Sequence, residues 1–137
     1  MREFDTANRI LIGKSGADHV TLEITEPLNQ DSWLEGNLDV RVGPWSGTIR
    51  VLFYQGELNR FASQIERLYS DLVGPAELHP MEPYLELRLC GNGRGAIILK
   101  GEAQDSPSSG TYLVFRLEMD QTELPAIATW LRTADPV

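Results

Sequence analysis

The sequence predicts an α+β fold of two layers, in which a meandering antiparallel sheet of about seven strands carries two amphipathic helices packed on one face. Two observations support this prediction. Residues 84–90, 95–103 and 111–119 alternate apolar and polar side chains with the period of two that is typical of a half-buried strand. Residues 57–73 and 122–132 repeat apolar side chains at three- and four-residue steps, as a helix with one buried stripe does.

The remaining strands are predicted from shorter alternating segments and their turns. Residues 9–13 and 18–25 form an opening hairpin through a turn at 14–17, and residues 34–42 and 48–54 form a second through a loop at 43–47. Residues 76–79 are suited to a short extra strand. Asn92-Gly93 is the strongest short turn signal, so residues 91–94 are expected to join 84–90 to 95–103.

The two helices have recognisable ends. Gly74-Pro75 stops the first helix, whereas Thr122 is the expected N-cap of the second and Pro125 is tolerated in its first turn. The apolar stripe of the first helix comprises Leu58, Phe61, Ala62, Ile65, Leu68, Tyr69 and Leu72, and that of the second comprises Leu124, Ile127, Ala128 and Leu131.

Length and composition indicate one domain over residues 1–137, with a buried core and a cytoplasmic location. No apolar run approaches the roughly 20 residues of a membrane-spanning helix. Residues 1–5 lack the apolar stretch of a signal peptide, and the single cysteine, Cys90, fits a reducing compartment. The net charge of -8 disfavours nucleic-acid and membrane partners and favours a basic protein. Self-association into a homo-oligomer stays open.

No catalytic residue, metal site or cofactor is predicted. Gly91, Gly93 and Gly95 precede another strand rather than a helix, so they favour a hairpin turn over a phosphate-binding loop. His19, His79 and Cys90 lack the paired spacing of metal ligands. The strand carboxylates Glu86, Glu102 and Glu118 accompany the cations Arg88, Lys100 and Arg116, and cross-strand ion pairs explain this mixture without catalysis.

Exposed aromatic and acidic side chains are the candidate protein-binding residues. Tyr and Trp are enriched at binding hot spots, and carboxylates suit a basic partner. Trp130 lies one position from the stripe of the last helix, so we expect it to cover the edge of the core. The candidates are Asp39, Trp45, Glu82, Tyr84, Glu86, Glu102, Tyr112 and Glu118.

Several motifs follow one another along the chain. They are Trp33-Leu34, Leu38-x-Val40-x-Val42, the turn Trp45-Ser46-Gly47, the helix from Leu58 to Tyr69, Pro80-Met81-Glu82-Pro83-Tyr84-Leu85, and Asp120-Gln121-Thr122-x-Leu124-Pro125. From about Ile10 onward the chain thereby resembles the WapI family of bacterial immunity proteins. The resemblance implies an antitoxin that binds the C-terminal domain of a contact-dependent, RHS-type toxin, such as a nuclease, and neutralises it in the cytoplasm. It brings no catalytic residues.

Two alternatives stay open from the residues alone. A small hydrolase could use two of the scattered carboxylates, and a deep pocket that joins them would favour it. A self-associating subunit could pair through an edge strand or an uncovered sheet face.

Overall fold

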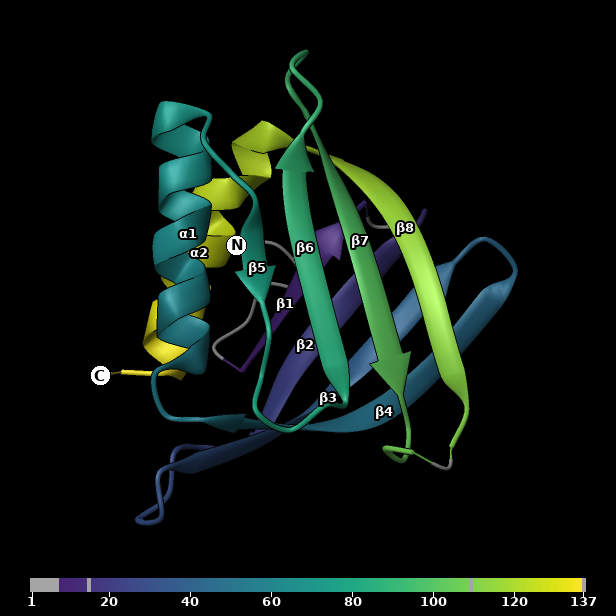
Figure 1. Cartoon of the computed structure of the whole chain (residues 1–137), viewed down its shortest axis with the longest axis vertical. Coiled ribbons are helices and arrows are strands. Elements are labelled where there is room, and N and C mark those ends of the chain that lie inside the picture. The colour runs from purple at the N-terminus through teal and green to yellow at the C-terminus, as the bar shows by residue number, and fades with distance from the viewer. Residues whose placement is uncertain (1–7, 15, 109, 137) are drawn as a thin grey trace.

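The chain forms four strands and a helix, and then repeats this order once (Figure 1). The computed structural model describes residues 8–14, 16–108 and 110–136, so the predictions for residues 1–5 and for Ser15 lie outside the described residues. The first half contains β1 Arg9–Gly13, β2 His19–Glu26, β3 Trp33–Val42, β4 Trp45–Tyr54 and α1 Glu57–Asp71. The second contains β5 Ala76–Leu78, β6 Leu85–Gly91, β7 Ala96–Gln104, β8 Tyr112–Asp120, the 3₁₀ turn η1 Gln121–Glu123 and α2 Leu124–Ala134.

The strands form two sheets, so the prediction of one sheet of about seven strands is wrong. β1, β2, β3 and β4 pair in that order, and β5, β6, β7 and β8 pair in that order, with every neighbouring pair antiparallel. α1 separates β4 from β5, which lets the chain start a second meander that packs against the first. Figure 1 shows the strands of the first sheet running obliquely behind those of the second.

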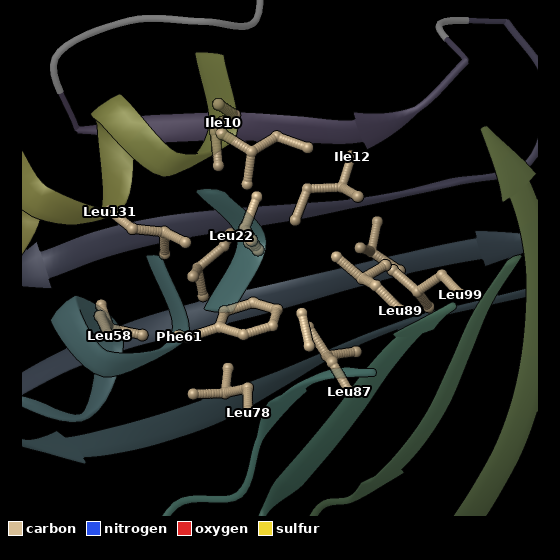
Figure 2. Packing of buried hydrophobic residues seen from close by; sticks show 14 of the residues in the cluster. Ile10, Ile12, Leu22, Leu58, Phe61, Leu78, Leu87, Leu89, Leu99 and Leu131 are labelled. Atoms are coloured by element: carbon tan, nitrogen blue, oxygen red, sulfur yellow. The ribbon is translucent and has the colours of Figure 1, made fainter. Parts of the chain in front are cut away.

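The core lies between the two sheets, because each sheet turns its apolar face toward the other. Figure 2 shows side chains from both sheets and both helices meeting around Phe61, which is 1% exposed. The buried residues include Ile10, Ile12, Val20 and Leu22 from the first sheet, Leu78, Leu87, Leu89 and Leu99 from the second, and Leu58 and Leu131 from the helices. Burial of each large apolar side chain contributes about 1.5–3 kcal/mol.

The helices close one side of the space between the sheets, rather than covering one face of a single sheet as predicted. They lie side by side, with α1 beside β5 and α2 beside β1 (Figure 1). α1 follows the first sheet along the chain and packs beside β5, the first strand of the second sheet. α2 follows the second sheet and packs beside β1, the first strand of the first sheet. Neither helix in the described ranges has the length and apolar character that a membrane crossing requires.

Several predicted boundaries are corrected by local geometry. α1 ends at Asp71 because Leu72 adopts a left-handed conformation with φ of 56°, and Leu72 is 75% exposed rather than part of the buried stripe. The second helix starts at Leu124 because the Asp120 carboxylate accepts hydrogen bonds from Thr122 N at 2.9 Å and Thr122 Oγ1 at 2.8 Å, which sets the turn η1 first.

The predicted loop at 43–47 is shorter in the structure, and the predicted place of Trp130 is confirmed. Only Gly43 and Pro44 separate β3 from β4, since Trp45 already pairs with Val42. Trp130 is 8% exposed and belongs to the core cluster.

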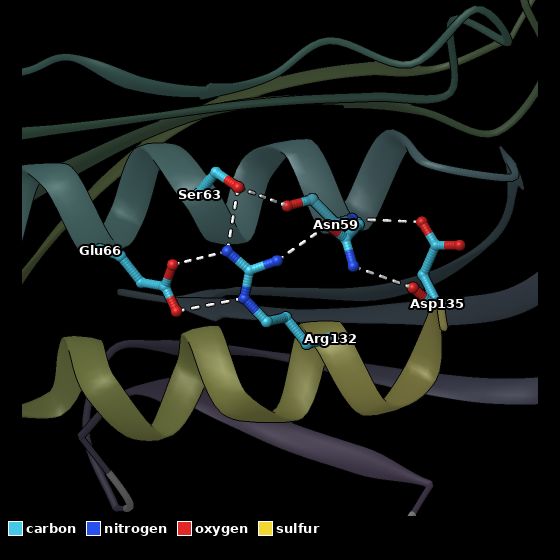
Figure 3. A network of polar contacts seen from close by, with 5 residues as sticks. All are labelled: Asn59, Ser63, Glu66, Arg132 and Asp135. Atoms are coloured by element: carbon cyan, nitrogen blue, oxygen red, sulfur yellow. Dashed lines mark hydrogen bonds and ion pairs between the residues drawn. The ribbon is translucent and has the colours of Figure 1, made fainter. Parts of the chain in front are cut away.

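A buried carboxylate near the C-terminal end of the described chain caps the start of α1 (Figure 3). Asp135 is fully buried, and its two oxygens accept hydrogen bonds from Gly56 N at 2.9 and 3.1 Å and from Asn59 N at 3.1 Å. The first amides of a helix have no partner within the helix, and α1 has no side-chain cap of its own. Asp135 therefore supplies the missing cap from across the molecule.

Arg132 ties the same two helices together one turn earlier. Its guanidinium donates to Asn59 Oδ1 at 2.8 Å, to Ser63 Oγ at 2.9 Å, and to both carboxylate oxygens of Glu66 at 2.5 and 3.1 Å. This hydrogen-bonded ion pair lowers the pKa of Glu66 below its usual value. The α1–α2 contact thus has fixed geometry in addition to its apolar packing.

The substitution Asp135→Ala should lower the free energy of unfolding by about 2–3 kcal/mol, because it leaves buried amides of α1 without an acceptor. Urea denaturation measures this change. The matched control is Asp31→Ala in an exposed loop, where little change is expected. Equal stabilities for the two variants would contradict the capping role.

Candidate functional site

The candidate binding residues do not gather on one surface. Asp39 and Trp45 belong to the first sheet, whereas Glu86, Glu102, Tyr112 and Glu118 lie on β6, β7 and β8 of the second. Glu82 and Tyr84 precede β6, where Tyr84 is half-buried and packs against the core. Asp39 lies on the outer face of the first sheet, whereas Trp45 stands opposite Val42 at the tip of the β3–β4 hairpin and shares the face of Val42. The structure therefore offers the two outer sheet faces and this exposed tip as separate sites.

The outer face of the first sheet is largely satisfied by its own side chains. Asp39 accepts hydrogen bonds from Arg41 Nε at 3.1 Å and from Thr48 Oγ1 at 3.0 Å. Arg50 donates to Glu35 at 2.8 Å, and this contact lowers the pKa of Glu35 and raises that of Arg50. No like charges stand directly opposite each other between β3 and β4, and where Glu26 stands opposite Glu35 between β2 and β3, Glu35 is bonded to Arg50. Asp39, Arg41, Glu35 and Arg50 thus have partners within the sheet.

The outer face of the second sheet, here called the open face, is organised differently. Figure 1 shows that neither helix crosses β6, β7 or β8 on the side toward the viewer. Alternation along the strands brings polar, aromatic and a few apolar side chains to this face. They include Glu77, His79, Glu86, Arg88, Cys90, Ile98, Lys100, Glu102, Gln104, Tyr112, Val114, Arg116 and Glu118.

One row across the open face is acidic. Glu86 and Glu102 stand directly opposite each other on β6 and β7. His79 pairs with Glu86, and the Tyr112 hydroxyl donates to Glu102. Partial burial and hydrogen bonding to Glu102 raise the pKa of Glu86, whereas hydrogen bonds from Tyr112 and Glu86 lower the pKa of Glu102. The two carboxyl groups therefore favour holding one proton on Glu86.

The neighbouring row is cationic, so the predicted cross-strand ion pairs on these strands are wrong. Arg88 stands opposite Lys100, and Lys100 stands opposite Arg116. Within the described ranges no carboxylate lies within ion-pair distance of these three side chains. The structure thus sets like charge beside like charge in both rows, which is unfavourable for the free protein.

A shallow hollow of about 380 Å³ lies where the two rows meet. Its walls include His79, Glu86, Arg88, Lys100 and Glu102. Apolar surface borders the rows, since Val114 is 66% exposed and Tyr112 is 54% exposed. The hollow is open to solvent and does not enclose a bound molecule on all sides.

The arrangement is poorly suited to carboxylate catalysis. Glu86 and Glu102 are within hydrogen-bonding reach of each other, whereas a retaining glycosidase separates its carboxyl groups by roughly 5 Å and an inverting one by more. In the described part of the chain, no three His, Cys, Asp or Glu side chains are grouped closely enough to hold a metal ion. Recognition of a charged partner is the chemistry that these groups support.

Sequence reasoning missed the cationic row and His79 as site residues. The period of two already assigned Arg88, Lys100 and Arg116 to the polar face. The period of two does not predict the strand register. The register decides whether a carboxylate or a second cation stands opposite Lys100.

Comparisons with known proteins agree on the fold and name one family. The sequence model of the Immunity protein WapI-like family matches residues 10–134. A search of curated proteins finds no match.

Two solved structures share the overall arrangement at low identity. The crystal structures of Trypanosoma bruciei MRP1/MRP2 give a TM-score of 0.53 at 13% identity, covering 92% of this chain and 81% of that one. A guide-RNA-binding protein complex bound to a guide RNA gives a TM-score of 0.51 at 13% identity, covering 92% of this chain and 86% of that one. At this identity the likeness concerns the fold alone.

The substitution Lys100→Thr should raise the free energy of unfolding by about 0.2–1 kcal/mol, because it removes the middle charge of three adjacent cations and Thr suits a strand. Thermal denaturation at low salt measures the change, and added salt should reduce it. The control Arg50→Thr removes a cation that is paired with Glu35 and should not stabilise. Stabilisation by both variants would contradict the like-charge argument.

The substitution Glu86→Gln should change how stability depends on pH. The raised pKa means that the folded state holds the Glu86 proton more tightly than the unfolded chain does. Protonation of Glu86 therefore stabilises the wild type fully below the ordinary value of 4.5, and this stabilisation is lost as pH rises through the folded pKa. The variant cannot lose it, so its free energy of unfolding should rise relative to that of the wild type between pH 4 and pH 7.

Urea denaturation at several pH values tests the expectation. The control is Glu118→Gln, whose side chain stands opposite Ile98 rather than opposite a carboxylate. The same pH-dependent difference for both variants would refute the assignment to the Glu86–Glu102 pair.

Proposed function

Because the chain belongs to the immunity protein WapI-like family, we propose that it neutralises a cognate toxin by binding the toxin domain as a stoichiometric inhibitor. The single observation that carries the proposal is the family match over residues 10–134. Inhibition takes place by obstruction in the cytoplasm, and the protein itself transforms nothing. The toxin domain encoded directly upstream is the candidate partner.

Electrostatics support a basic toxin. The net charge of -8 attracts a positively charged protein and speeds its diffusional encounter. A nuclease that cuts a polyanion has reason to be basic, so a nuclease toxin fits this partner best. One of the two similar structures is described as a guide-RNA-binding complex. We nevertheless assign a protein partner, because the acidic surface repels a phosphate backbone.

The open face is the proposed contact surface. Its carboxylates Glu86, Glu102 and Glu118 stand beside the exposed Tyr112, and a flat, uncovered sheet gives the area that a protein interface needs. Glu82 and Tyr84 border this face. Asp39 and Trp45 lie on the first sheet, and Asp39 is already bonded to Arg41 and Thr48, so the pair is a secondary candidate.

The protein should co-purify with the upstream toxin domain as a 1:1 complex at micromolar concentration and low salt. Its co-expression should also restore growth to cells that express the toxin. Light scattering gives the stoichiometry, and a concentration series of the protein alone reports self-association. Separate elution of the two proteins at low salt would refute the proposal.

The substitution Glu102→Arg should weaken the complex at least about tenfold, or ~1.4 kcal/mol, because it removes a carboxylate from the contact surface. The control Glu23→Arg makes the same change in net charge on the outer face of the first sheet. Titration calorimetry of both variants separates a local contact from general attraction. Equal weakening by the two would count against the open face.

A further inference from the structure

We propose that the open face recognises its partner through two neighbouring rows of opposite charge, and that the toxin domain offers acidic side chains to Arg88, Lys100 and Arg116. A basic side chain of the same domain meets Glu86 and Glu102. This inference rests on the proposed function. It adds a requirement that the net charges of the two proteins do not predict, namely that the basic toxin domain carries an acidic patch where it contacts the open face.

The cationic row is the first support. Arg88, Lys100 and Arg116 stand side by side on three adjacent strands, all are exposed, and within the described ranges none has an ion-pair or hydrogen-bond partner. Three arginines on other surfaces are paired, Arg41 with Asp39, Arg50 with Glu35 and Arg132 with Glu66. The row is thus an unpaired group of three positive charges on an acidic protein.

The strand register is the second support. A slide of β7 by two residues would keep its side chains on the same faces, but it would separate Gly101 from Phe115, whose ring fills the space beside this glycine. Such shifts would set Lys100 opposite Glu86 on one side or opposite Glu118 on the other. The observed register instead sets Lys100 opposite Arg88 and Arg116. The arrangement costs stability in the free protein, and an acidic partner that covers the row relieves this repulsion.

The two rows fix the orientation of the partner. They lie two residues apart along each strand, which is about 7 Å. A partner that docks correctly matches both rows, whereas a partner turned end for end sets like charge on like charge, which is costly once water is excluded. The hollow bordered by Glu86, Arg88, Lys100 and Glu102 receives one side chain between the rows.

A protein fits this pattern better than a nucleic acid does. Carboxylates flank the cations on three sides, with Glu77 opposite Arg88 on β5, Glu86 and Glu102 in the next row, and Glu118 two residues beyond Arg116. A phosphate backbone that reached the three cations would also meet these carboxylates. A protein surface supplies both signs of charge within a few ångströms.

The test is Lys100→Glu in the full chain, titrated with the upstream toxin domain by calorimetry. The control Arg67→Glu makes the same change in charge on the exposed side of α1. We expect Lys100→Glu to weaken binding at least tenfold and Arg67→Glu to leave it unchanged or slightly tighter. Melting temperatures of both variants exclude unfolding, since Lys100→Glu removes a repulsion.

The outcomes separate the two proposals. No binding by the wild type refutes both the proposed function and this inference. Tight binding by the wild type with equal or tighter binding by Lys100→Glu refutes the inference alone, because simple attraction of opposite net charges gives that result. Salt-dependent binding of a single-stranded RNA oligonucleotide by the wild type, lost in Lys100→Glu, would reassign the row to nucleic acid.

Discussion

Each sheet has a single apolar face, and each of these faces is buried only because the other sheet packs against it. Four strands on each side therefore pack across a common core, and the helices fill the opening at one side of it, with Phe61 of α1 at the centre. Burial thus uses both inner faces and leaves both outer faces uncovered. Every polar feature discussed above follows from this constraint, because the outer faces are the large surfaces that remain for recognition.

The two outer faces differ in how their charges are balanced. On the first sheet, Asp39 is bonded to Thr48 and Arg50 to Glu35 on the neighbouring strand. On the second, like charges stand opposite each other in two rows, and His79 and Tyr112 bond the carboxylates of the acidic row. The charges of the cationic row have no such partner within the described ranges, so they leave attraction for another molecule. The chain belongs to the immunity protein WapI-like family, and the open face is the surface that we propose for contact with a partner.

The sequence predicted which segments form strands and helices, since periods of two and of three to four residues are local properties. It did not predict the division into two sheets, because alternation shows that Leu87 is buried but not which layer covers it. The register was not predicted either, because a shift of two residues keeps Leu89 and Leu99 inside while it changes which side chains stand opposite Lys100. The cap of α1 by Asp135 was not predicted, because Asp135 and the Gly56 amide that donates to it are 79 residues apart in the sequence.

That long separation also has a consequence for synthesis. The first turn of α1 waits for a carboxylate that the ribosome adds 79 residues after Gly56, and α2 must reach β1 before it has a surface to pack on. Until that segment has emerged, the amides of Gly56 and Asn59 lack their carboxylate acceptor and the apolar stripe of α2 is absent from the core. α1 and α2 therefore stabilise each other only in the chain that extends through Asp135.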